Sequence, residues 1–189
     1  MAEAPEKNLA LDIVRITEAA ALASARWLGR GAKEDGDGAA VDAMRNSFST
    51  LHVDGIVVIG EGEKDNAPML YNGEHVGIGD GPQLDVAVDP VEGTSLLAFG
   101  RPNAISTVAV APRGSMFNPG PSFYMQKLVV PGEARNVVDL DAPVAVNLAN
   151  VAKALGKKVQ DLVVFVLDKP RHKQLIADIR AVGARIQLH

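Results

Sequence analysis

The sequence contains no cysteine, which excludes disulfide bonds and thiolate metal sites. Aromatic residues make up only 4%, so the core has to be built mainly from aliphatic side chains. Basic residues do not outnumber acidic ones, and the formal net charge of −4 argues against nucleic-acid binding. No apolar run approaches the roughly 18 residues of a membrane span, and the first eight residues lack the features of a signal peptide. We therefore expect a cytoplasmic protein that does not bind membranes.

The remaining composition is that of a globular protein, with 47% hydrophobic and 22% charged residues. Apolar periodicity, glycine and proline predict alternating helices and strands. A helix start is expected at Asp37, as an N-cap. The expected helices cover 8–28, 38–51, 143–155 and 170–182, and the expected strands cover 56–59, 84–88, 105–111, 124–130, 163–167 and 184–188. The strand at 163–167, the helix at 170–182 and the strand at 184–188 form a β-α-β pattern. The expected fold class is therefore mixed α and β.

Acidic residues follow two of these strands directly. Glu61 comes after the strand at 56–59, and Asp89 and Glu92 come after the strand at 84–88, which we expect to end at Pro90. Two adjacent strands that end in this way would direct their carboxylates into one cleft. Clustered carboxylates persist when a hard cation neutralises them, and oxygen ligands favour Mg²⁺ or Mn²⁺.

Simpler interpretations of these residues stay open at this point. Glu61 could belong to a solvated loop, Asp37 could be only an N-cap, and Asp89-Pro90 could only start a turn. Tyr124 could be an ordinary strand residue. The four histidines have no spacing typical of metal ligands. The two acidic turns together favour a metal site.

Several motifs resemble one family, in order and along essentially the whole chain. Asp-Pro-Val-Glu-Gly-Thr at 89–94 is similar to the metal-binding signature of the lithium-sensitive phosphatase superfamily, and Glu92 points to its class II fructose-1,6-bisphosphatases. Further matching stretches are Trp27–Gly31, Asp37–Val41, Val58–Glu63, Ala67–Tyr71, Tyr124–Leu128 and Lys169–His172.

The resemblance implies a layered α/β sugar-phosphatase fold. An N-terminal α+β metal-binding domain would cover residues 1–160, and residues 161–189 would be the incomplete start of a C-terminal α/β domain. The implied reaction is hydrolysis of the 1-phosphate of fructose 1,6-bisphosphate to fructose 6-phosphate and phosphate, a step of gluconeogenesis. Mn²⁺ or Mg²⁺ would be the cofactor, the sugar bisphosphate the small-molecule partner, and a homodimer or homotetramer the assembly.

The resemblance also implies roles for individual residues. Asp37 and Glu61 would bind one metal, and Asp89 and Glu92 a second. Thr94 would orient the attacking water, so that the catalytic set is Asp37, Glu61 and Thr94. Substrate contacts would come from Glu92, Gly93, Thr94, Tyr124, Lys169, Pro170 and Arg171, the last because a guanidinium fork suits phosphate oxygens. Lys33 occupies the family's basic position before Asp37.

Members of this family are longer, and they carry a further substrate loop and metal-binding glutamate beyond the position of His189. We therefore expect impaired activity from this chain alone. Three alternatives remain: a dual fructose-1,6-/sedoheptulose-1,7-bisphosphatase, an inactive metal-binding fragment, and the less favoured inositol-monophosphatase type.

Overall fold

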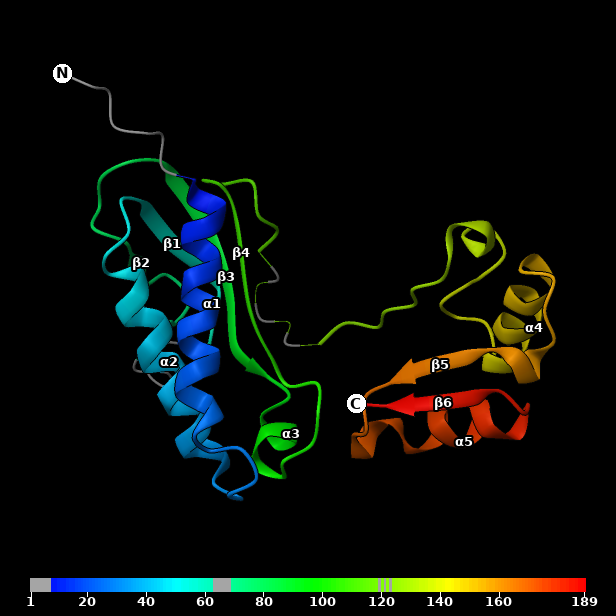
Figure 1. Ribbon diagram of the computed structural model, residues 1–189. Helices are drawn as coiled ribbons and strands as arrows, with labels where there is room; N and C mark the ends of the chain where they lie inside the picture. Colours follow the sequence, from blue (N-terminus) through cyan, green and yellow to red (C-terminus); the bar gives the residue numbers. More distant parts are fainter. Residues whose placement is uncertain (1–7, 63–68, 119, 121, 123) are drawn as a thin grey trace. The chain divides into compact units, whose positions relative to one another are not determined.

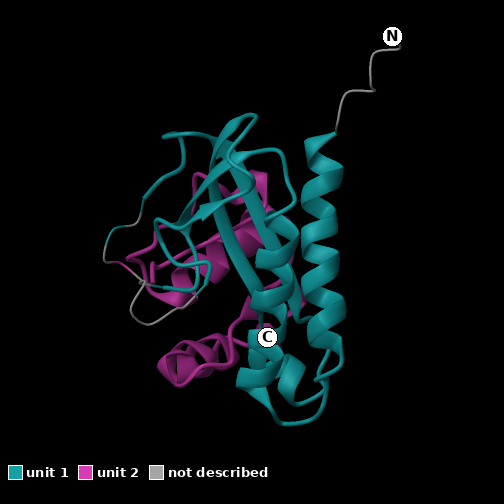
Figure 2. Cartoon of the chain, turned by 90° about the vertical axis from the view of Figure 1, so that its left-hand side faces the viewer, with its two compact units in different colours: residues 1–121 teal, residues 122–189 magenta. Residues whose placement is uncertain are grey.

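The computed structural model describes residues 8–62, 69–118, 120, 122 and 124–189. Its contacts divide the chain into two compact units, residues 1–121 (unit 1) and residues 122–189 (unit 2), which Figure 2 colours separately. This division falls earlier than the domain boundary predicted at residue 160, which stays a prediction. None of the helices in the described part of the chain is long and apolar enough to cross a bilayer.

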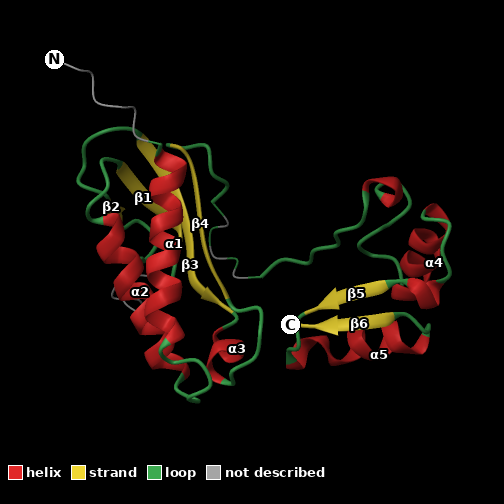
Figure 3. Cartoon of the chain, in the orientation of Figure 1, coloured by secondary structure: helices red, strands yellow, loops and turns green. Residues whose placement is uncertain are grey.

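Unit 1 contains a four-stranded mixed sheet with the strand order β2-β1-β3-β4 (Figures 1 and 3). The two central strands, β1 and β3, run parallel, and each pairs with its outer neighbour in the antiparallel sense. The strands are β1 (Asp54–Ile59), β2 (His75–Val76), β3 (Gln83–Glu92) and β4 (Ile105–Pro112). The strands predicted at 56–59, 84–88 and 105–111 are confirmed, whereas the two-residue β2 was not predicted.

The long helices α1 (Leu9–Ala25) and α2 (Lys33–Phe48) cover one face of this sheet (Figure 1). Their small and apolar side chains pack with alternate strand residues, because neighbouring residues of a strand point to opposite faces. Burying this apolar surface is the main stabilisation of the unit. Its fully buried members include Ile16, Ala20, Ala40, Met44, Phe48, Val57 and Val86.

The start of α2 differs from the prediction. The helix begins at Lys33, so Asp37 lies inside it and is not the N-cap. Two acidic residues in the first turn favour this earlier start, because the N-terminal end of a helix carries partial positive charge. Gly36 is needed where α2 approaches its neighbours, since a Cβ there would lie 2.8 Å from Leu97 Cδ2. Gly36 therefore lowers the intrinsic helix propensity of α2, but it allows the helix to pack closely against Leu97.

Strand β3 continues past the predicted stop. Pro90 lies within β3, and the prediction that the strand ends at Asp89-Pro90 is wrong. The pairing with β4 shifts register between Asp89 and Glu92, so the missing N–H of the proline falls at an irregularity of the ladder. A short helix, α3 (Thr94–Ala98), follows directly.

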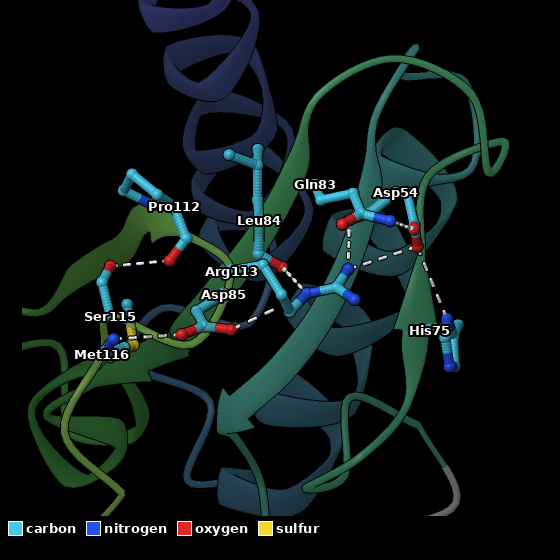
Figure 4. A network of polar contacts seen from close by, with 9 residues as sticks. All are labelled: Asp54, His75, Gln83, Leu84, Asp85, Pro112, Arg113, Ser115 and Met116. Carbon is cyan, nitrogen blue, oxygen red and sulfur yellow. Dashed lines mark hydrogen bonds and ion pairs between the residues drawn. The ribbon is translucent and has the colours of Figure 1, made fainter.

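Arg113, just after β4, ties together the starts of the parallel strands (Figure 4). Its Nε donates to the backbone oxygen of Leu84 at 3.2 Å, and its Nη2 donates to the backbone oxygen of Asp54. Asp85 is nearly buried and accepts a hydrogen bond from the Met116 N–H at 3.0 Å. That backbone hydrogen bond is the main cause that lowers the pKa of Asp85. The contacts at the starts of β1 and β3 therefore favour the ionised form of Asp85.

Unit 2 contains the predicted β-α-β arrangement. Parallel strands β5 (Val163–Val166) and β6 (Arg185–Leu188) are connected through α5 (Lys173–Ala181), and α4 (Val144–Ala154) packs into the same apolar cluster. Three short 3₁₀ turns complete the unit: η1 (Gly132–Ala134), η2 (Val159–Asp161) and η3 (Pro170–His172). The helices predicted at 143–155 and 170–182 are confirmed, the second with a 3₁₀ first turn.

The strand predicted at 124–130 is wrong. These residues form no regular secondary structure and pair with no strand among the described residues. Most of their side chains face solvent, with Tyr124 77% and Val129 90% exposed, and only Val130 packs against the apolar cluster of unit 2. Alternation of apolar residues is only half of what a strand needs, because its backbone groups also require a neighbouring strand.

Candidate metal and phosphate site

The parallel pairing of β1 and β3 brings two acidic segments to the same end of the strand pair. Glu61 lies two residues beyond the end of β1, Asp89 lies in β3 and Glu92 is the last residue of β3. Helix α2 carries Asp37 toward them, and Asp37 raises the pKa of both Glu61 and Asp89 through its charge. The pairing confirms that the two strands are neighbours that run in the same direction, whereas a common cleft for these acids stays a prediction.

The electrostatics of these four carboxylates are unfavourable without a cation. Burial, then the charges of Asp37 and Asp89, raise the pKa of Glu61 to about 7. Burial, then the charge of Glu92 and a hydrogen bond with it, raise the pKa of Asp89 to about 6. Burial also raises the pKa of Asp37, although the neighbouring Lys33 acts in the opposite direction. The acids are therefore held close together and partly out of water.

Such a group fits a hard cation by charge and by donor type, since every donor is a carboxylate oxygen. Glu61 has Asp37 as its strongest charged neighbour, and Asp89 has Glu92. The division of the four acids between two metal positions stays a prediction. Within the described ranges no three acidic or histidine side chains converge as a ready-made ligand group. The assignment of the four residues as metal ligands therefore stays a prediction.

Gly93 connects the acidic end of β3 to α3. It takes the left-handed conformation with φ 88°, which favours glycine, and it is the N-cap of the helix that begins at Thr94. A Cβ at this position would also lie 3.0 Å from Leu96 Cδ1. The turn thus places Thr94 directly after the acidic end of β3, and its role in orienting water stays a prediction.

The predicted phosphate-gripping residues lie in unit 2. Lys169 precedes η3, and Pro170 and Arg171 are its first two residues. The Arg171 guanidinium carbon lies 4.5 Å from the centre of the Tyr124 ring, which is a cation–π contact. The structure therefore brings together two candidate substrate residues that are 47 positions apart in the sequence. Both side chains are exposed, so the guanidinium fork is accessible to an anion.

Some motif residues lie outside the described residues, namely Glu63, Ala67 and Pro68. The sequence analysis also missed functional candidates. Leu70 and Asn72 form hydrogen bonds with the turn that carries Glu61. Leu70 lies in the matching stretch Ala67–Tyr71, but the only signal for Asn72 was Asn72-Gly73, a common turn pair, which does not reveal a contact 12 residues away.

Comparison with known proteins assigns the chain to a family. The sequence model described as "Bacterial fructose-1,6-bisphosphatase, glpX-encoded" matches residues 7–189, so the chain belongs to this family. It is 50% identical over 180 residues to fructose-1,6-bisphosphatase 1 class 2 of Escherichia coli (strain K12), and equally to fructose-1,6-bisphosphatase class 2 of Shigella flexneri. In both cases the match covers 95% of this chain and 53% of the relative. The chain thus spans about half the length of these relatives.

Proposed function

We propose that this chain is the metal-binding part of an enzyme that hydrolyses the 1-phosphate of fructose 1,6-bisphosphate to fructose 6-phosphate and phosphate. The observation that carries the proposal is the cluster of carboxylates near the shared end of β1 and β3. Asp37, Glu61 and Asp89 in this cluster all have raised pKa values. The family and the names of the relatives support the substrate. Gluconeogenesis, a cytoplasmic location and a homodimer or homotetramer belong to the same proposal.

Asp37 and Glu61 would hold one Mn²⁺ or Mg²⁺, and Asp89 and Glu92 the other. Bound divalent cations supply charge stabilisation and water activation in phosphoryl transfer. The chain's own groups would do the rest of the positioning. Thr94 would orient the attacking water through its hydroxyl, and Glu92 and Gly93 would contact the substrate beside it.

Unit 2 would provide the grip on the distal phosphate. Lys169 and Arg171 contribute positive charge, and Pro170 fixes the backbone of the turn between them. Tyr124 would contact the sugar phosphate while its ring holds the Arg171 guanidinium. The finer assignment of the layered sugar-phosphatase fold, with a metal-binding domain over 1–160 and the start of a second over 161–189, is part of this proposal.

The test is phosphate release from fructose 1,6-bisphosphate with Mn²⁺, for the wild type, Asp89→Ala and Asp42→Ala. Asp42 is an exposed acid on α2 and serves as the matched control. We expect slow release from the wild type and Asp42→Ala, and none from Asp89→Ala. Equal release from all three would refute the assignment of Asp89. If none releases phosphate, Mn²⁺ binding that is lost in Asp89→Ala alone would support the inactive metal-binding fragment. Faster hydrolysis of sedoheptulose 1,7-bisphosphate would instead favour the dual enzyme.

A further inference from the structure

The turn that carries Glu61 is held by a short neighbouring segment, residues 70–72. The Glu61 N–H donates to the Leu70 carbonyl at 2.9 Å, and the Asn72 N–H donates to the Gly62 carbonyl at 3.0 Å. The Asn72 side chain adds a third link, since its Oδ1 accepts from the Gly60 N–H at 2.9 Å. The backbone on both sides of Glu61 is therefore fixed by hydrogen bonds from outside the turn.

The backbone of this segment is strained in a way that serves these contacts. Leu70 is fully buried and has φ 55°, a left-handed conformation that is unfavourable for any residue with a side chain like leucine's. Its carbonyl approaches Gly60 so closely that a Cβ on Gly60 would lie 2.0 Å from the oxygen. Such strain persists only where the surrounding structure enforces it, and it gathers at functional sites.

A turn-forming asparagine is the simpler explanation of Asn72, because Asn and Gly commonly form turns together. A side chain with only that role would bond the backbone of its own turn. Asn72 Oδ1 instead accepts from Gly60, which is 12 residues earlier and adjacent to Glu61.

We propose that Asn72 is a positioning residue, which holds the backbone from Gly60 to Gly62 so that the Glu61 carboxylate stays beside Asp37 and Asp89. The inference rests on the proposed function in one respect, namely that Glu61 binds a cation. Asn72 itself does not contact the cation or the substrate in this proposal. Its effect passes through the orientation of Glu61.

The experiment compares the wild type, Asn72→Ala, Asn72→Asp and the control Asn46→Ala in the 189-residue chain. Asn46 is an exposed residue of α2. Three quantities are measured: amide hydrogen exchange of Gly60 and Glu61 by NMR without metal, the Mn²⁺ dissociation constant by electron paramagnetic resonance, and Tm. Asn72→Asp keeps an oxygen where the Gly60 N–H donates, and it therefore tests for rescue.

In Asn72→Ala we expect the Gly60 and Glu61 amides to exchange about fivefold faster, which corresponds to the loss of one hydrogen bond. The Mn²⁺ dissociation constant should rise by a similar factor while Tm changes by only a few degrees. Asn72→Asp and Asn46→Ala should retain wild-type exchange. Unchanged Gly60 exchange in Asn72→Ala, or equal loss of Mn²⁺ affinity in Asn46→Ala, would overturn the inference. A wild type that binds no Mn²⁺ would instead refute the proposed metal site, and the exchange rates would still decide whether Asn72 holds this turn.

Discussion

Replacing Glu61 by glutamine should stabilise the metal-free protein. The pKa of Glu61 is 4.5 as the ordinary value of an unfolded chain and about 7 in the folded protein. The protein therefore loses folding stability as pH rises between these two values, because Glu61 ionises more readily in the unfolded state. A rise of this size corresponds to about 3 kcal/mol at most. Because the Glu61 side chain is only half-buried and solvent screens its charge, we reduce the figure to about 1–2 kcal/mol at about pH 8. Glutamine has the same shape but does not ionise, so Glu61→Gln should recover that amount.

Urea unfolding in the presence of a chelator measures this gain. The fluorescence of Trp27, the single tryptophan, reports the unfolding of unit 1 separately from unit 2. At about pH 4 the two proteins should be equally stable, since Glu61 is then protonated in both states. The control Glu18→Gln removes an exposed acid of α1, whose ion pair with Arg15 should contribute little. If Glu61→Gln is no more stable than the wild type at about pH 8, the argument that these acids repel one another in the folded state fails.

Two other substitutions test the roles of Asp85 and Arg171. Asp85→Asn should lower the Tm of unit 1 at neutral pH, and the difference should begin to shrink as pH falls below about 4, because stability from a lowered pKa is lost on acidification through that pKa. A Tm difference that grows toward low pH would contradict this. Arg171→Lys should raise KM for the bisphosphate about tenfold while leaving the Mn²⁺ dissociation constant unchanged, because lysine cannot form the guanidinium fork. Arg180→Lys, an exposed change on α5, is the control, and equal KM values for the two variants would refute the role of Arg171.

Local patterns predicted most of the helices and strands, because their apolar residues recur with the period of the element they form. The meeting of Glu61 with Asp89 was also predictable, since it needed only two neighbouring strands. The passage of β3 through Pro90 was not, because a proline is acceptable only where the ladder is irregular. The prediction of a strand at 124–130 was wrong for a different reason. The apolar pattern there is compatible with a strand, but no partner strand pairs with it among the described residues.

The part of the site that escaped the sequence depends on backbone geometry. The left-handed Leu70 is a conformation that leucine rarely takes, and no propensity argument would select it. The hydrogen bond of Asn72 to Gly60 joins residues whose connection is set by the fold. Family resemblance supplied the roles of Asp37 and Thr94, which composition and spacing could not assign.

The two ends of the central strand pair respond to acidity in opposite directions. At the start of β3, Asp85 stabilises the fold when it is ionised, whereas at the opposite end of the strand pair ionised Glu61 and Asp89 oppose it. The metal-free chain should thus have its stability optimum on the acid side of neutrality, and a bound divalent cation should shift that optimum upward. In practical terms, this protein should be harder to keep folded at neutral or higher pH with a chelator than in a slightly acidic buffer, and added Mn²⁺ should help if the proposed site binds it.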